Sequence, residues 1–386
     1  MTTIGALAAV LALAGCTADQ AAPAPAPAAT LATPSVTPTG EPAAPEPTAT
    51  PLAPQPAGPA LPPATASPQD VLTGLVTPWS LAFLPGGAVL VTLRDTGQVL
   101  LLAVDGVAPL TGPGADALAT GTVHGGEGGL LGVAVHPSEP EVFLYRTAVG
   151  GNEVVRATLD PVARTLGPLQ LVLGGIPAAR THNGGRLAIG PDGFLYVTTG
   201  DAGSPSSAQD PASLAGKILR LALDGTAAPG NPEGGAVWSL GHRNVQGIGW
   251  TADGRMLAAE FGQNTWDELN LVVPGGNYGW PVVEGVGSRA GYLDPLRVWA
   301  TDDASPSGLA VSASGVHLAG LRGERLWTVP LTADGATGEP YASLDLGRLR
   351  DVVSGPDGAL WVLTQNTDGR GSPRAGDDRL VRLTPP

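Results

Sequence analysis

Six short turns rich in Pro, Asp, Ser and Gly are each followed by an apolar run that is typical of a β-strand. The turns recur roughly every 40 to 60 residues, a period that indicates a propeller or a solenoid. They lie at 85–87, 136–138, 191–193, 252–254, 313–315 and 356–358, and the following runs read AVLVTL, EVFLYR, FLYVTT, RMLAAE, VHLAGL and ALWVLT. This repeat constrains the fold more than any other feature of the chain.

The repeat and the chain length together predict an all-β, six-bladed β-propeller over residues 69–386. The segment holds about 318 residues, or about 53 for each of six units, which is enough for a four-stranded blade with its loops. Helices are not expected there, because 56 Gly and 39 Pro interrupt almost every window and no long segment has apolar residues at helical spacing.

The amino-terminal part of the chain has the composition of a targeting segment followed by a linker. Residues 4–14 are apolar and precede Cys16, the only cysteine, in a pattern that resembles the lipid-modified cysteine of bacterial lipoproteins. A plain secretory signal with an incidental cysteine is the alternative. We expect a signal peptide over 1–15, a disordered Pro/Ala/Thr-rich linker over 16–68, and an exported protein held by lipid on Cys16 at the periplasmic or cell-surface face of the envelope.

The charge of the chain argues against nucleic acid as a partner. The net charge is −14, and Lys217 is the single lysine against 19 arginines. Binding of phosphates needs clustered cations that release counterions, and such clusters are scarce here. The few arginines that gather in short motifs are therefore informative.

His182 and Asp201 are the first candidate pair for chemistry. His182 precedes the strand FLYVTT, and Asp201 follows its far end. Because the inner strand of a blade runs along the central channel, we expect the two side chains to meet. An imidazole held by a carboxylate can accept a proton at physiological pH. A structural loop histidine is the alternative.

Arginine motifs supply a second set of candidates. The loop Gly241–Gly247 carries Arg243 and Asn244, which suit carboxylates and carbonyls or amides respectively. Arg348 and Arg350 alternate along a predicted strand, so both guanidinium groups should share one face. Two adjacent cations favour an anionic ligand between them, although surface arginines paired with aspartates remain an alternative.

Oxygen donors are concentrated in residues 260–281. Carboxylates, side-chain amides and glycine-flanked carbonyls are ligands that Ca²⁺ prefers. With one cysteine and five histidines in the chain, Zn or Cu is not expected. The spacing is not that of an EF-hand loop, so composition alone leaves the calcium site open.

Taken together, six segments resemble the soluble sugar dehydrogenases that depend on pyrroloquinoline quinone (PQQ). The resemblance covers about residues 72–386, and the HNGG and GHRN blocks carry it most specifically. The segments are GEGGLLGVAVHP (126–137), THNGGRLAIGPDGFLYVTTGDAG (181–203), LAGKILRL (214–221), LGHRNVQGIGW (240–250), WDELNLVVPGGNYGWP (266–281) and LRDVVSGPDGALWVLT (349–364).

The resemblance implies a propeller whose central face holds PQQ over Ca²⁺ and oxidises aldoses at C1 to lactones. It implies that His182 is the general base with Asp201 as its carboxylate partner. Arg243 would stabilise charge as hydride arrives, beside Asn244 at the cofactor. An external acceptor, a quinone or a cytochrome near the membrane, would then take the electrons.

Further contacts follow from the same resemblance and are likewise expectations. Arg348 and Arg350 would bind the PQQ carboxylates, Arg322 stands where glucose dehydrogenases carry a lysine, and Glu127 stands at the cofactor where they carry a glutamine. The backbone carbonyls of Gly262 and Gln263 would bind the calcium under PQQ. A second, structural calcium would use the region of Glu268 and Tyr278.

The chain also departs from the glucose enzymes. Thr181 replaces an acidic residue before the base, and residues 301–306 lack the Trp and Thr that line the sugar pocket. The sugar itself stays open. Two other functions are weighed: a calcium-dependent lactonase, which would need acidic or amide side chains converging on a channel metal, and a non-catalytic propeller that binds a protein partner.

Overall fold

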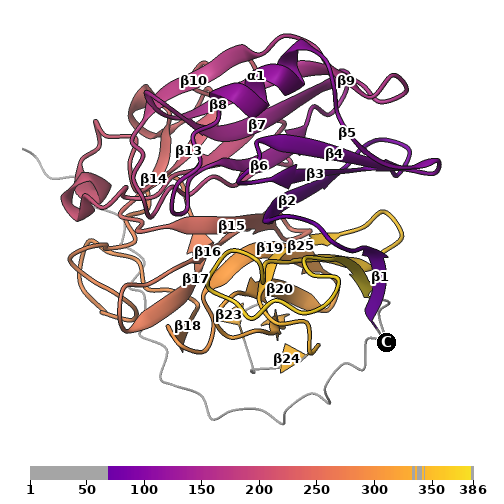
Figure 1. Ribbon diagram of the computed structural model, residues 1–386. Helices are drawn as coiled ribbons and strands as arrows, with labels where there is room; N and C mark the ends of the chain where they lie inside the picture. The colour runs from indigo at the N-terminus through magenta and orange to yellow at the C-terminus, as the bar shows by residue number, and fades with distance from the viewer. Residues whose placement is uncertain (1–67, 333–334, 337–340, 343, 384–386) are drawn as a thin grey trace, which may run out of the picture. The chain divides into compact units, whose positions relative to one another are not determined.

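Six antiparallel sheets of four or five strands form the blades of a β-propeller in the described part of the chain (Figure 1). The computed structural model describes residues 68–332, 335–336, 341–342 and 344–383. The expected signal peptide, Cys16 and the linker up to residue 67 lie outside the described residues. The predicted six-bladed fold is confirmed.

The first three blades follow one another along the chain. Blade 1 contains β2 (Pro78–Phe83), β3 (Val89–Leu93), β4 (Gln98–Ala103) and β5 (Gly106–Pro109). Blade 2 contains β6 (Leu130–Val135), β7 (Glu141–Ala148), β8 (Gly151–Asp160) and β10 (Gln170–Ile176), with β9 (Thr165–Leu166) paired to β8. Blade 3 contains β11 (Leu187–Ile189), β12 (Leu195–Thr198), β13 (Lys217–Leu221) and β14 (Val237–Leu240).

The remaining blades complete the ring. Blade 4 contains β15 (Val245–Trp250), β16 (Met256–Glu260), β17 (Trp266–Val272) and β18 (Arg297–Ala300). Blade 5 contains β19 (Pro306–Ser312), β20 (Gly315–Gly320), β21 (Leu326–Val329) and β24 (Tyr341–Ala342), near a small hairpin of β22 (Leu331–Thr332) and β23 (Gly335–Ala336). Blade 6 contains β25 (Leu349–Ser354), β26 (Leu360–Thr364), β27 (Leu380–Leu383) and β1 (Pro68–Leu72).

Blade 6 joins strands from the two ends of the described chain. β1 supplies the outer strand and pairs antiparallel with β27, in a register that places Pro68 opposite Leu383 and Asp70 opposite Val381. The other three strands of the blade come from residues 349–383. This pairing closes the ring of blades.

Helix α1 (Pro113–Gly121) is a difference from the helix-free expectation. Its nine residues are too few to give a periodic signal, but Pro113 starts the helix with its fixed φ, and Leu118 is buried against blades 1 and 2. Two short 3₁₀ helices lie at Pro205–Gln209 and Pro232–Gly234. No helix among the described residues is long and apolar enough to cross a bilayer.

The six predicted turns join the first strand of each blade to the second, so the apolar runs are second strands. The strand FLYVTT is therefore β12, and the inner strand of blade 3 is β11; this corrects our expectation that FLYVTT lines the channel. A second strand is covered by a neighbouring blade on each face. Every residue of β3 and β12 is accordingly buried, and a continuous apolar run replaces alternation.

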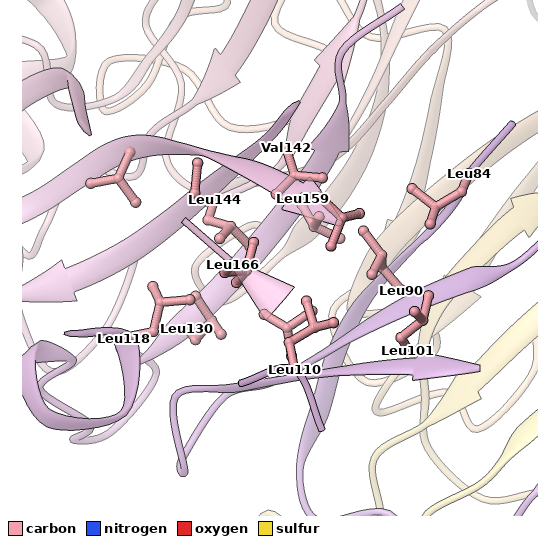
Figure 2. Packing of buried hydrophobic residues seen from close by; sticks show 14 residues of the cluster. Leu84, Leu90, Leu101, Leu110, Leu118, Leu130, Val142, Leu144, Leu159 and Leu166 are labelled. Atoms are coloured by element: carbon pink, nitrogen blue, oxygen red, sulfur yellow. The ribbon is translucent and has the colours of Figure 1, made fainter. Parts of the chain in front are cut away.

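The hydrophobic core is divided among the interfaces between blades. Six clusters of buried side chains occur in the described chain. Each lies mainly between two adjacent blades, and Trp79 of blade 1 joins the cluster between blades 2 and 3. Figure 2 shows the cluster between blades 1 and 2, where Leu90 and Leu101 face Leu144 and Leu166. Packing between blades holds the inner strands in place, and these strands position the site described next.

Candidate functional site

The candidate site lies where first strands begin and second strands end. In an antiparallel hairpin these two ends are adjacent, so the loops before β11 and after β12 share one face of the propeller. A cavity of about 450 Å³ opens at this face. Nine predicted site residues line it, namely Glu127, His182, Arg243, Asn244, Gly262, Gln263, Arg322, Arg348 and Arg350.

A second cavity of about 450 Å³ lies further along the inner strands, and its walls are mainly apolar. Among its lining residues, the charged groups are Arg186 and Asp351, which form a buried ion pair of 2.8 Å between Nη1 and Oδ2. Arg186 also donates to Ser80 Oγ at 2.8 Å. The charged side chains that could hold an anionic ligand therefore gather in the first cavity.

His182 and Asp201 meet as predicted. His182 Nδ1 lies 2.7 Å from Asp201 Oδ1, and Asp201 is fully buried behind the imidazole. Gly203 N–H and the Trp280 indole N–H each donate to Asp201 at 2.8 Å. Burial alone would raise the pKa of Asp201, but hydrogen bonds from His182, Gly203 and Trp280 outweigh it and lower the pKa. An ionised Asp201 that accepts Nδ1–H leaves His182 Nε2 as the basic atom.

The backbone of His182 is in the left-handed region, with φ of 59°. Glu127 Oε2 accepts the His182 N–H at 2.8 Å, and Ala202 N–H donates to the His182 carbonyl at 3.1 Å. A Cβ on Gly200 would lie 1.9 Å from that carbonyl oxygen, so only glycine fits there. The loop thus fixes an unfavourable conformation that presents the imidazole to the cavity.

Glu127 has both carboxylate oxygens engaged by protein groups. Oε2 accepts the His182 N–H, and Oε1 pairs with Arg370 Nη1 at 3.1 Å. Glu127 lies in the cavity wall, and its place at the cofactor stays a prediction. Its contacts add a role in holding His182, which the sequence did not indicate.

The backbone of Arg243 is held by a relay of side chains from blades 3 and 4. Glu260 Oε1 accepts the Arg243 N–H, and Glu260 Oε2 lies 2.8 Å from His242 Nδ1. His242 Nε2 in turn lies 2.8 Å from Ser239 Oγ. Although Ser–His–Glu is the order of a nucleophilic triad, Ser239 and His242 are fully buried, so no substrate reaches this hydroxyl.

The guanidinium of Arg243 lies on the cavity wall, 5.3 Å from the Trp280 ring centre. Burial lowers its pKa, while nearby carboxylates including Asp201 act in the opposite direction. Its Nε is buried and has no hydrogen-bond partner among the described residues. Asn244 Oδ1 accepts the Gly184 N–H at 3.0 Å, which ties the loop to the one bearing His182.

Arg350 is a buried cation whose hydrogen-bond partners are neutral. Its Nε donates to Gln365 Oε1 at 2.6 Å, and its Nη1 donates to Gln246 Oε1 at 2.7 Å and to Ser307 Oγ at 3.1 Å. Burial, followed by the charge of Arg94, lowers the pKa of Arg350 to about 9, so it is still a cation at neutral pH. A buried charge of this kind favours an anion in the adjoining cavity.

Other arginines of the cavity differ in their surroundings. Arg348 is buried and pairs with Asp368 at 3.2 Å, whereas the Arg322 side chain is 60% exposed and pairs with Asp302 at 2.7 Å. Arg94 is buried, lines the same wall and pairs with its neighbour Asp95. Sequence reasoning missed Arg94, because an Arg–Asp dipeptide after a strand has the pattern of an ordinary surface pair.

Gly262 and Gln263 lie in a loop that is gathered around Glu284. Glu284 Oε1 accepts the N–H groups of four successive residues, at 2.8 to 3.2 Å, namely Gln263, Asn264, Thr265 and Trp266. Gly262 N–H donates to Asp267 Oδ1 at 2.9 Å. These hydrogen bonds fix the part of the chain whose carbonyls are the expected calcium ligands.

Glu268 and Tyr278 lie outside this cavity. They line a small neighbouring pocket, where burial and the charge of Glu260 raise the pKa of Glu268, and the Tyr278 hydroxyl donates to the Leu271 carbonyl at 2.6 Å. No group of three or more His, Cys, Asp or Glu side chains in the described chain is arranged to hold a metal. The second calcium site stays a prediction.

Comparison with known proteins gives a consistent result. The family model for glucose/sorbosone dehydrogenase matches residues 75–381. The PQQ-bound structure of aldose sugar dehydrogenase from Streptomyces coelicolor is 46% identical, with a TM-score of 0.77, over 84% of this chain and 99% of that one. Aldose sugar dehydrogenase YliI of Escherichia coli is 32% identical over 76% of this chain and 88% of its own length. Quinoprotein glucose dehydrogenase B of Acinetobacter calcoaceticus is 34% identical over 58% of this chain and 54% of its own length.

Proposed function

The chain belongs to the glucose/sorbosone dehydrogenase family, and on that basis we propose that it oxidises aldose sugars at C1 to lactones with PQQ and calcium. It is an oxidoreductase of the PQQ-dependent sugar dehydrogenase type. The substrate position, the calcium and the roles of individual residues are the parts that we infer from the site.

The observation that carries the proposal is the buried Arg350 beside Arg348 and Arg94 in one cavity wall. Arg350 has only neutral hydrogen-bond partners among the described residues, so its charge calls for an anion. A tricarboxylate such as PQQ supplies that charge and matches the forked donors of arginine. The donor set of the cavity therefore fits the cofactor.

His182 would act as the general base. Asp201 holds Nδ1 of His182, and His182 lines the cavity. Nε2 is therefore the nitrogen that can take the proton of the C1 hydroxyl. Asp201 would then stabilise the imidazolium. As C1 loses its hydrogen as hydride, the C1–O bond becomes a carbonyl and the lactone forms.

Arg243 would provide positive charge on the same wall, beside the base. Its Nη1 donates to the Phe261 carbonyl at 3.3 Å, whereas its Nε has no partner among the described residues and would donate to a ligand oxygen. The carbonyls of Gly262 and Gln263 would hold Ca²⁺. When bound, PQQ accepts the hydride, and Ca²⁺ makes its quinone a stronger acceptor as a Lewis acid.

The lactonase alternative has less support. It would need acidic or amide side chains converging on a metal in the channel and has no use for paired arginines. The cavity presents two carboxylates and three amides, but also six arginines. The Ser239–His242–Glu260 relay is sealed from solvent. We also propose, from the sequence alone, a lipid anchor on Cys16 and a quinone or cytochrome as the electron acceptor.

The test is to add PQQ and Ca²⁺ to the purified apo-protein and follow dye reduction with a panel of aldoses. Sugar-dependent reduction that requires both additions is the expected result, and product analysis should find the lactone. Hydrolysis of lactones, with no reduction for any aldose, would overturn the proposal.

A further inference from the structure

We propose that Glu284 is a positioning residue that presents the calcium-binding carbonyls of Gly262 and Gln263 to the cavity. The inference rests on the proposed function, because it concerns the calcium of the same site. Glu284 itself lies behind the cavity wall, in the small pocket that it shares with Glu260. It therefore acts on the metal through the loop.

The geometry of the peptide bond carries the argument. In a planar trans peptide unit, the N–H and the preceding C=O point in opposite directions. The N–H groups of Gln263 and Asn264 both point at Glu284 Oε1, at 2.8 and 3.2 Å. The carbonyl oxygens of Gly262 and Gln263 must then point away from Glu284. These are the two carbonyls expected to bind calcium, and both residues line the cavity.

Two further contacts make the loop a fixed arrangement. Thr265 and Trp266 donate to the same oxygen at 3.0 and 3.1 Å, so one carboxylate oxygen orients four consecutive peptide units. A Cβ on Gly262 would lie 1.8 Å from the Trp266 carbonyl, so the tight curl requires glycine at this position. A carboxylate that accepts several N–H groups gives strong, charge-assisted hydrogen bonds. Removal of Glu284 would leave the two carbonyls free to rotate.

A neighbouring loop offers a matched control. Asp294 Oδ1 accepts the N–H groups of Gly287 and Ser288 at 2.9 and 3.0 Å, which is the same kind of contact. None of these three residues lines the cavity. Asp294→Asn therefore removes a loop-holding carboxylate of equal charge without touching the carbonyls in question.

The experiment measures calcium affinity rather than turnover. Chelator-treated protein saturated with PQQ is titrated with CaCl₂ in a calorimeter. In parallel, without PQQ, the midpoint temperature of thermal unfolding is measured as calcium is added. Glu284→Ala should bind calcium about 10- to 100-fold more weakly, the usual effect of losing a group that orients metal ligands. Glu284→Gln keeps an oxygen acceptor and should fall between wild type and Glu284→Ala, while Asp294→Asn should match wild type.

The outcomes separate this inference from the proposed function. If the wild-type protein binds no calcium, the calcium assignment itself fails and the inference fails with it. If wild type binds calcium and Glu284→Ala binds it equally well, only the inference is overturned. Equal losses of calcium affinity in Glu284→Ala and Glu284→Gln would assign the effect to charge alone. That result would also overturn the positioning role of Glu284.

Discussion

The indole Nε1 of Trp280 donates a 2.8 Å hydrogen bond to Asp201 Oδ2, the carboxylate oxygen that faces away from His182. The same indole ring lies 5.3 Å from the guanidinium carbon of Arg243. One side chain thus contacts both the partner of the expected base and the cation of the opposite loop. Trp280 and Asp201 are both buried, so the hydrogen bond between them is closed to solvent.

Trp280→Phe removes the hydrogen bond to Asp201 and keeps an aromatic ring near Arg243. A hydrogen bond to a charged group contributes about 1.5 to 3 kcal/mol, so we expect kcat to fall roughly 10- to 100-fold. Steady-state dye reduction at saturating PQQ measures the change. Trp299→Phe is the control, because the buried Trp299 Nε1 has no hydrogen-bond partner in the described chain. The kcat of this variant should equal that of wild type. Equal kcat in both variants would contradict the prediction.

His182→Ala should lower turnover by about two to four orders of magnitude, the span that a general base contributes. The affinity for PQQ should stay close to that of wild type, because no charge that attracts the carboxylates is lost. Fluorescence titration with PQQ and single-turnover dye reduction measure the two quantities separately. Loss of PQQ binding with little change in turnover would show that the role of His182 is misassigned.

Arg350→Met should weaken PQQ binding about 10- to 100-fold, with a much smaller effect on turnover at saturating PQQ. The partners left behind, Gln365, Gln246 and Ser307, are neutral, so no buried charge is stranded. Arg348→Ala should also weaken PQQ binding more than it slows the loaded enzyme, but it strands the buried Asp368 and should lower the thermal midpoint as well. Equilibrium titration with PQQ and thermal unfolding distinguish the two variants.

Acid should destabilise the protein through His317, which lies in β20 of blade 5 and does not line the cavity. Burial lowers the pKa of His317 to about 4, and its ring nitrogens contact Ser312 Oγ at 2.8 Å and Thr328 Oγ1 at 3.0 Å. Between pH 6.5 and 4 the unfolded chain binds a proton that the folded chain does not, so stability falls as the pH drops, by about 2 kcal/mol at pH 5.

Urea unfolding at pH 7.5 and pH 5.0 measures this loss. In His317→Gln, the free energy of unfolding should differ less between pH 7.5 and pH 5.0 than it does in wild type. This holds whatever the stability of the variant at pH 7.5. His124→Gln, at a mainly exposed histidine, should leave the difference as in wild type. An unchanged difference in His317→Gln would refute the prediction.

The sequence predicted the blades well because their hairpin turns recur and their second strands are continuously apolar. It also predicted the meeting of His182 with Asp201, but for a different reason: the two residues flank the hairpin β11–β12, whose open end faces the cavity. It placed FLYVTT one strand too close to the axis, because a second strand buried on both faces reads like an inner strand.

Contacts between distant loops were beyond sequence reasoning. Trp280 meets Asp201 across 79 positions of the chain, and no local pattern links an indole to a particular carboxylate. Glu284 approaches the loop after β16 from 18 to 21 positions away, in a segment with no periodic signal. Such pairings depend on how the loops of one face converge, and this is decided by the ring as a whole.

The pairing of β1 with β27 joins two segments that are remote in the sequence. Residues near position 70 must wait, unpaired, until residues near position 381 have been synthesised. Loop closure over so long a separation is slow, and the exposed edge of β26 stays open to wrong partners in the meantime. A nascent chain that stops before β27 would therefore leave the edges of β1 and β26 unpaired, and the ring of blades would not close.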